Sequence, residues 1–210
     1  MIEILPAILG YSIEAVKNQC ERMSFAPLLH LDVVVPPLAT PPTPYRATDF
    51  LDWEKTDLVL HLMTKDPVAA IAEWQILPQV KRFYVHFESG IKTEILAELT
   101  EHYNIYLSVN AETPLTEASE HIKLCHGLQL MGVKLGRAGQ NRVPGAVERV
   151  KQARALWPEI IIGFDGGLKA NKDELVAFKM AGVTSFSMGA AFIESDEPAQ
   201  LYQEMKSWLN

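Results

Sequence analysis

The chain has 210 residues, of which 48% are hydrophobic and 21% charged, so it can bury one sizeable core and shows no compositional sign of disorder. Nineteen Lys and Arg against 26 Asp and Glu give a net charge of −7, which argues against broad nucleic-acid or anionic-membrane binding, because both need clustered cations. No apolar run approaches the roughly 20 residues of a membrane span, and the first residues lack the basic start of a secretory signal. We therefore expect a cytoplasmic protein with no nucleic-acid or membrane partner, in which Cys20 and Cys125 are buried, reduced thiols.

Short β-branched runs alternate with amphipathic stretches along the whole chain. The expected strands are Ile2 to Leu9, Leu28 to Val35, Asp57 to Met63, Phe83 to Glu88, Asn104 to Asn110, Gly127 to Leu135, Glu159 to Phe164 and Thr184 to Phe192. The expected helices are Ser12 to Met23, Asp66 to Leu77, Ile91 to His102, Pro114 to Cys125, Val143 to Trp157, Asn171 to Ala181 and Glu197 to Leu209, with a weak one near Asp49 to Trp53.

Eight such units in 210 residues leave about 26 residues for each, which is the size of one strand, one helix and two short loops. This pattern predicts the α/β class, as a (β/α)8 TIM barrel that forms a single domain over residues 1–210. The alternative is a doubly wound open sheet, which would normally have fewer strands and a glycine-rich fingerprint after the first strand.

Polar residues collect where three of the predicted strands end. His30 and Asp32 share one face of the second strand because side chains alternate, His61 closes the third strand and Asp165 closes the seventh. In a barrel these four side chains can converge at the mouth, where chemistry is located. Two imidazoles and two carboxylates suit one divalent transition metal ion such as Zn²⁺, Fe²⁺, Mn²⁺ or Co²⁺. The alternative for each histidine alone is a hydrogen-bonded core residue.

Glycines form a second group at the same end of the strands. Gly166 and Gly167 follow Asp165, Gly189 closes the eighth strand, and a loop that contains Gly139 follows the sixth. Glycine-rich loops after strands 7 and 8 are the usual phosphate cradle of this fold, since bare backbone N–H groups can approach an anion closely. Tight turns without a ligand are the alternative interpretation.

The motifs, taken together, resemble those of the ribulose-phosphate 3-epimerases. The matching segments run from end to end: Pro6-Ala7-Ile8-Leu9, His30-Leu31-Asp32-Val33, His61-Leu62-Met63, His86-Phe87-Glu88, Asn110 with Thr113-Pro114, Met131-Gly132-Val133, Gly139-Gln140, Asp165-Gly166-Gly167 and Gly189. Their order and strand positions are more specific than any one of them.

The resemblance implies a (β/α)8 barrel and a phosphorylated ketose as substrate. It implies metal ligands at His30, Asp32, His61 and Asp165, with Asp32 and Asp165 as the acid/base pair, and phosphate contacts at Gly139, Gly166, Gly167, Gly189 and Ala190. It also places Ala7, Met63 and Met131 in the substrate pocket, and a homo-oligomer is expected on the same ground. Inverting a carbon next to a ketone needs one acid/base group on each face of a flat enediolate, and a metal ion would stabilise its charge.

This chain departs from the family pattern around the substrate. Ala7 and Ala190 replace serines, and Leu135 begins a loop that differs from the family's Pro-Gly-Phe-Gly turn. After the second strand, five of the 13 prolines fall in a nine-residue stretch, Pro36 to Pro44, in place of the family's Met-Asp-Gly. These changes indicate altered substrate recognition or reduced activity, and the proline-rich loop is expected to face the substrate. Arg137 and Arg142 are candidate phosphate contacts, with exposed surface arginines as the alternative.

Three other functions stay open from the sequence. One is an epimerase for a hexulose 6-phosphate. A second is a catalytically weak relative that binds a phosphosugar or metal for regulation. A third is an imine-forming aldolase that uses Lys134, which we discount because strand alternation sends that side chain outward if Met131 points inward. For His86 and Glu88 we expect a supporting or structural role rather than a catalytic one.

Overall fold

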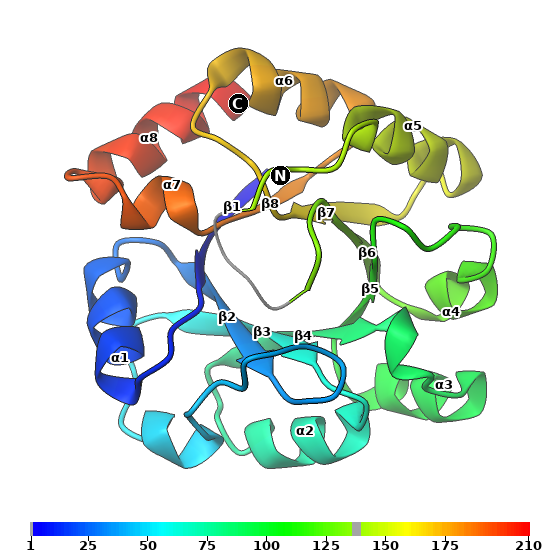
Figure 1. Cartoon of the computed structure of the whole chain (residues 1–210), viewed down its shortest axis with the longest axis horizontal. Coiled ribbons are helices and arrows are strands. Elements are labelled where there is room, and N and C mark those ends of the chain that lie inside the picture. The colour runs from blue at the N-terminus through cyan, green and yellow to red at the C-terminus, as the bar shows by residue number, and fades with distance from the viewer. Residues whose placement is uncertain (1, 136–139) are drawn as a thin grey trace.

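A computed structural model describes residues 2–135 and 140–210 of the chain (Figure 1). Eight parallel strands close into a barrel in chain order, and helices surround it, so the predicted (β/α)8 TIM barrel is confirmed. The strands are β1 (Glu3–Ile8), β2 (Leu28–Val34), β3 (Asp57–Met63), β4 (Val80–His86), β5 (Ile105–Val109), β6 (Gly127–Met131), β7 (Ile161–Asp165) and β8 (Ser185–Met188).

The helices form the outer layer of Figure 1. They are α1 (Ile13–Arg22), α2 (Pro67–Trp74), α3 (Thr93–His102), α4 (Ser119–Leu124), α5 (Ala146–Leu156), α6 (Lys172–Ala181), α7 (Ala190–Ile193) and α8 (Pro198–Leu209). Two short 3-10 helices, Ala47–Phe50 and Phe87–Ser89, follow β2 and β4. The weak helix expected near Asp49 is thus a single 3-10 turn, and β2 has no α-helix of its own in the described chain.

Helix starts follow local capping chemistry. The side chain of Ser12 accepts a hydrogen bond from the backbone N–H of Ala15, and Asp66 and Asn171 do the same at α2 and α6. These caps satisfy N–H groups that have no partner within the helix, so these three helices begin next to the predicted residue. Helix α4, which has no side-chain cap, begins at Ser119 rather than at the predicted Pro114.

Two strands, β6 and β8, end four residues earlier than the sequence predicts. β6 stops at Met131 because the backbone of Gly132 turns in against the loop after β7, where an added Cβ would lie 2.4 Å from the Gly166 carbonyl oxygen. β8 stops at Met188 because Gly189 opens the short helix α7 instead of continuing the strand. Both early endings lie at the mouth of the barrel, and each places a glycine there.

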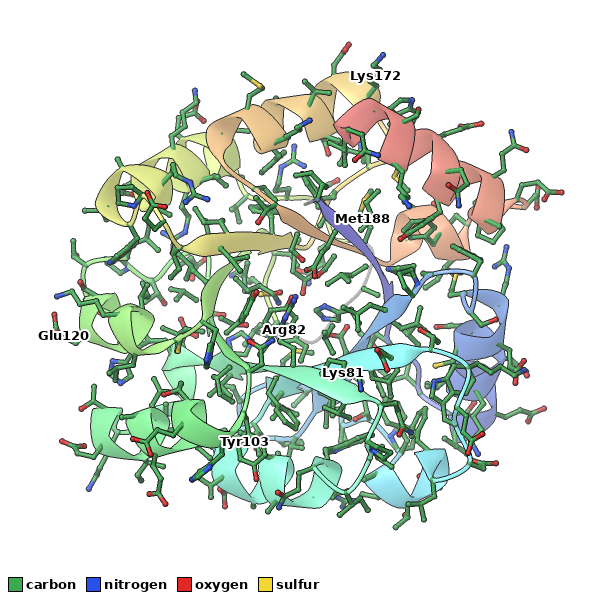
Figure 2. All side chains as sticks on the ribbon, turned by 180° about the vertical axis from the view of Figure 1, so that it is seen from behind. Lys81, Arg82, Tyr103, Glu120, Lys172 and Met188 are labelled. Atoms are coloured by element: carbon green, nitrogen blue, oxygen red, sulfur yellow. The ribbon has the colours of Figure 1, made fainter. Side chains whose placement is uncertain are left out.

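The amino-terminal end of the barrel is closed by packed side chains. Arg82 of β4 donates to both carboxylate oxygens of Glu3 at 2.9 and 3.1 Å, and its guanidinium lies 4.2 Å from the ring centre of Tyr106. Figure 2, seen from behind, places Arg82 within the ring of strands. Because this end is filled, open space for a ligand lies at the opposite, carboxyl end of the strands.

Both cysteines are free thiols, as expected, although Cys125 is half-buried rather than fully buried. Burial raises the pKa of each thiol to about 12. Within residues 2–135 and 140–210, no helix combines the length and the apolar character that crossing a bilayer requires.

Candidate active site

Strand register brings three of the predicted ligands together. In the β2–β3 ladder Asp32 pairs with His61, and in the β1–β2 ladder Ala7 pairs with His30. His30 and Asp32 are two residues apart on one strand, so both point into the barrel. The Nε2 atom of His30 and the Nδ1 atom of His61 lie 3.1 and 2.8 Å from Oδ1 of Asp32.

The fourth predicted ligand, Asp165, reaches the same point from β7. Its Oδ2 atom lies 3.7 Å from Nε2 of His30 and 3.4 Å from Nδ1 of His61. One candidate ligand atom from each of the four residues falls within 4.8 Å of the others. Ligands at about 2.1 Å from a tetrahedral ion are about 3.4 Å apart, so the cluster has the spacing as well as the donor types of a transition-metal site.

The cluster is buried, and its carboxylates are more exposed than its imidazoles. Side-chain exposure is 0% for His30 and 1% for His61, against 15% for Asp32 and 14% for Asp165. Burial alone would raise the pKa of Asp32, but its hydrogen-bond contacts and charge interactions with the two histidines lower it overall. Burial raises the pKa of Asp165, although both histidines oppose this. Burial by itself would lower the pKa of His30, and the two carboxylates raise it.

Two buried polar residues that sequence reasoning missed contact this cluster. Ser187 of β8 lies 2.9 Å from Nδ1 of His30 through its hydroxyl oxygen. Gln129 of β6 donates an amide hydrogen to Oδ2 of Asp165 at 3.4 Å. Gln129 is the polar side chain of an otherwise apolar strand, two residues before Met131, and Ser187 alternates with apolar residues in β8, two residues before Gly189. Those patterns are the signals that could have identified them.

His86 and Glu88 continue the cluster outward from His61. The Nε2 atoms of His61 and His86 are 2.7 Å apart, and Nδ1 of His86 lies 3.2 Å from Oε2 of Glu88. Burial lowers the pKa of His86 to about 4. Burial by itself would raise the pKa of Glu88, whereas hydrogen bonds from His86 and Thr113 lower it overall. The pair therefore contacts a candidate ligand and stands behind it, away from the open cavity.

A cavity of about 730 Å³ opens above the cluster at the barrel mouth. Most of the predicted site residues line it: Ala7, Asp32, His61, Met63, Met131, Asp165, Gly166, Gly167, Gly189 and Ala190. His30 lies beneath the surface, fully buried. Gly139, the remaining predicted phosphate contact, and Arg137 fall outside the described residues.

The turn after β7 has a shape that glycine alone fits easily. Gly166 and Gly167 have φ values of +102° and +69°, a region that other residues rarely adopt. Arg142 supports this turn by donating to the Gly167 carbonyl at 3.0 Å and pairing with Glu174 at 2.9 and 3.1 Å. Arg142 is therefore half-buried rather than an exposed surface arginine, and it lines the cavity while part of its guanidinium is engaged by these partners.

Replacing Gly167 with Ala should damage this turn. The added Cβ would lie 2.8 Å from the backbone nitrogen of Arg142, so overpacking adds to the cost of positive φ, and we expect unfolding to become easier by roughly 2–5 kcal/mol. Gly145→Ala is the matched control, because Gly145 has φ +76° with nothing within 4 Å, and it should cost only roughly 1–2 kcal/mol. Chemical denaturation of both variants measures the difference, and equal losses would contradict the account.

The proline-rich loop does not face the cavity as the sequence led us to expect. Its ends are tied together: Thr43 donates its N–H to the Val34 carbonyl, and the Val34 N–H donates to Oγ1 of Thr43, both at 3.1 Å. The hydroxyl of Tyr45 then donates to the backbone carbonyl of Asp32. None of residues 35–44 lines the cavity, and the loop reaches the site through Ala39, which packs with Val34 and Met63.

Lys134 does not have the surroundings of an imine-forming lysine. Its side chain is 78% exposed at the cavity rim, and its ammonium lies 3.7 Å from a carboxylate oxygen of Glu112. Such lysines are activated by a dry pocket or a second cation, neither of which describes this position.

A parallel eight-stranded barrel with a buried His/Asp cluster and a glycine turn at its mouth defines the class of TIM-barrel proteins whose site lies at the carboxyl ends of the strands. The model of the ribulose-phosphate 3-epimerase family matches residues 3–193. The chain belongs to this family, and it is thus an isomerase of the epimerase type.

Named relatives support the assignment at low identity. A ribulose-phosphate 3-epimerase of Chlamydia trachomatis serovar D is 27% identical over 209 residues, covering 92% of this chain and 87% of the relative. The Chlamydia muridarum protein of the same name is 24% identical, with coverage of 92% and 89%. Among solved structures, a 3-hexulose-6-phosphate synthase superposes with a TM-score of 0.68 at 13% identity over the full length of both chains, which supports the fold alone.

Proposed function

We propose that this protein inverts the carbon next to the ketone of a phosphorylated ketose, with ribulose 5-phosphate and xylulose 5-phosphate as the leading pair. One observation carries the proposal. Asp32 and Asp165, each with a neighbouring histidine, meet at the floor of a cavity whose wall includes the glycine turn at residues 166–167. Family membership supports the same reaction class.

The two aspartates suit acid/base chemistry on opposite faces of one carbon. They come from β2 and β7, and each keeps a second carboxylate oxygen beyond the one that faces the histidines. In the proposed reaction one aspartate takes the proton from its face of the carbon, and the other returns a proton to the opposite face. The planar intermediate between these steps lies between the two carboxylates.

The residues fit a divalent transition metal ion of the Zn²⁺, Fe²⁺, Mn²⁺ or Co²⁺ type, held by His30, Asp32, His61 and Asp165. Neutral imidazole and carboxylate donors at the observed spacing support this fit. When bound, such an ion supplies a positive charge that stabilises the negative charge developing on the substrate oxygens.

The glycine turn would anchor the phosphate of the substrate. One side of the cavity is lined by Gly166, Gly167, Gly189 and Ala190. Because the three glycines have no side chains, an anion could approach their backbone closely. An anchored phosphate would fix the reacting carbon between Asp32 and Asp165, which converts binding energy into orientation. Gly139 is proposed as a further phosphate contact.

The pocket beside the β1–β3 strands is apolar apart from the cluster itself. Ala7, Leu9 and Met63 line it, and Met131 faces them from β6. This apolar wall keeps water away from the reacting carbons, whereas polar side chains such as Asn141 and Lys169 line other parts of the cavity. A hexulose 6-phosphate is the second substrate to assay.

The direct test follows the α-proton of the substrate. Protein loaded with Co²⁺ or Zn²⁺ is incubated with ribulose 5-phosphate in deuterated water, and proton NMR follows both epimerisation and deuterium incorporation. We expect both to occur. The proposal is wrong if neither this sugar nor hexulose 6-phosphate exchanges its α-proton. Thermal stabilisation by the sugar without exchange would instead indicate a binding relative.

A further inference from the structure

We propose that His86 and Glu88 are positioning residues that hold the proton of His61 on Nε2, so that the Nδ1 lone pair of His61 is presented to the metal ion. This inference rests on the proposed metal site, and it assigns a role to two residues that line up behind that site. It also names which nitrogen of His61 is the ligand atom.

At Glu88 the hydrogen bonds have a fixed direction. Its Oε1 atom accepts a hydrogen bond from the backbone N–H of Asn110 at 2.9 Å and another from the hydroxyl of Thr113 at 2.6 Å. These two donors, together with the lowered pKa of Glu88, identify the group as a carboxylate that accepts. Its other oxygen, Oε2, faces Nδ1 of His86 at 3.2 Å, so the ring donates there.

The proton arrangement then propagates along the chain of rings. A neutral His86 that carries its proton on Nδ1 has a bare Nε2 atom, which can only accept. That atom lies 2.7 Å from Nε2 of His61, and one proton must stand between two nitrogens so close together. His61 therefore supplies it, and with an ion bound its Nδ1 atom, which faces Asp32 and Asp165 at 2.8 and 3.4 Å, would present a lone pair to that ion.

The reverse arrangement is unfavourable at each step. If His86 donated from Nε2, its bare Nδ1 lone pair would face the Glu88 carboxylate. The lone pair and the carboxylate would repel each other at a buried position. His86 is fully buried, so water cannot compensate. The loop behind Glu88 is itself fixed, because Arg149 donates to the carbonyl oxygens of Asn110 and Thr113 at 2.9 and 2.6 Å.

The other histidine of the cluster is oriented differently. His30 points Nε2 at the two carboxylates, and its Nδ1 atom meets the Ser187 hydroxyl at 2.9 Å. A hydroxyl can donate or accept, so Ser187 imposes no tautomer by itself. The His86–Glu88 pair therefore fixes the tautomer of His61, and no equivalent pair fixes that of His30 among the described residues.

Long-range ¹H–¹⁵N NMR correlations of the imidazole rings test the assignment directly. In Zn²⁺-loaded protein we expect a proton on Nε2 of His61 and on Nδ1 of His86, and the His86 proton should stay on Nδ1 in metal-free protein. A proton on Nδ1 of His61 in the Zn²⁺ form, or on Nε2 of neutral His86 in either form, would overturn the proposal.

Metal affinity provides the second measurement, made by titrating Co²⁺ and following its visible absorption. We expect His86→Leu to weaken Co²⁺ binding by roughly 10–100-fold. His86→Gln should recover most of that loss, because its amide oxygen can still accept from His61. His102→Leu, at the exposed end of α3, is the control and should bind as the parent does. Unchanged affinity in a folded His86→Leu protein would contradict the proposal.

The two proposals fail in different ways. If the tautomers and affinities are as expected but no sugar is epimerised, the proposed function is wrong and the role of His86 stands. If sugars are epimerised but His86 carries its proton on Nε2, the proposed function stands and this inference is wrong. Protein that binds neither Zn²⁺ nor Co²⁺ would overturn both.

Discussion

Asp165→Asn should lower epimerisation by about 10²–10⁴-fold while leaving the affinity for the phosphate group largely unchanged. The amide cannot take or return a proton, whereas the glycine turn that follows β7 keeps its backbone. The measurement is the rate of interconversion of ribulose 5-phosphate and xylulose 5-phosphate, with substrate affinity determined separately by calorimetry. Asp173→Asn, on the exposed first turn of α6, is the matched control and should retain full activity.

Asp32→Asn extends this test, because each aspartate is assigned to one face of the carbon. Each variant keeps one base, so each should still exchange the α-proton of one epimer with deuterated water, slowly and without inversion. Asp165→Asn and Asp32→Asn should therefore show residual exchange with opposite epimers. Residual exchange with the same epimer in both variants would contradict the two-base arrangement, and parental activity in either would remove that residue from the mechanism.

Metal removal is the second change with a large expected effect. Prolonged dialysis against a chelator should abolish epimerisation, and Zn²⁺ or Co²⁺ should restore it. Metal at 1,000 times its dissociation constant stabilises the folded state by about 4 kcal/mol, which corresponds to a rise in Tm of about 8–16 °C for a chain of this size. Differential scanning calorimetry of the metal-free and the reloaded protein measures the shift.

Variants show whether the stabilisation comes from the His/Asp cluster. His61→Ala removes one of the four proposed ligands and should lose nearly all of the metal-dependent shift in Tm. His102→Ala removes an exposed histidine and should keep it. A shift of equal size in both variants would place the ion elsewhere, and full activity in thoroughly metal-free protein would exclude a metal-dependent reaction.

Much of the fold could be predicted from the sequence because its signals are local. Nearly continuous apolar runs predict parallel strands covered on both faces, and Ser12, Asp66 and Asn171 mark helix starts by capping chemistry. The early ends of β6 and β8 could not be predicted in the same way. They depend on the approach of Gly132 to Gly166 and of Gly189 to Ala7, which are contacts between segments far apart in the chain.

The candidate site, too, could be predicted only in part. His30, Asp32, His61 and Asp165 were predictable because strand alternation and the barrel rule both place them at one mouth. The contacts of Gln129 with Asp165 and of His86 with His61 were not, since they require the register of β4 and β6 against their neighbours. The ion pair of Arg142 with Glu174 could not be predicted for a similar reason, because the two residues lie 32 positions apart.

The tie between Val34 and Thr43 has a consequence for how this protein can be altered. Residues 35–42 form a loop between Val34 and Thr43. Because these two residues are hydrogen-bonded to each other, the ends of the loop are held together without any contact from its tip. The tip can therefore be lengthened, shortened or replaced as a cassette without moving Asp32. This makes the loop the natural place to graft new substrate contacts over an otherwise unchanged reaction centre.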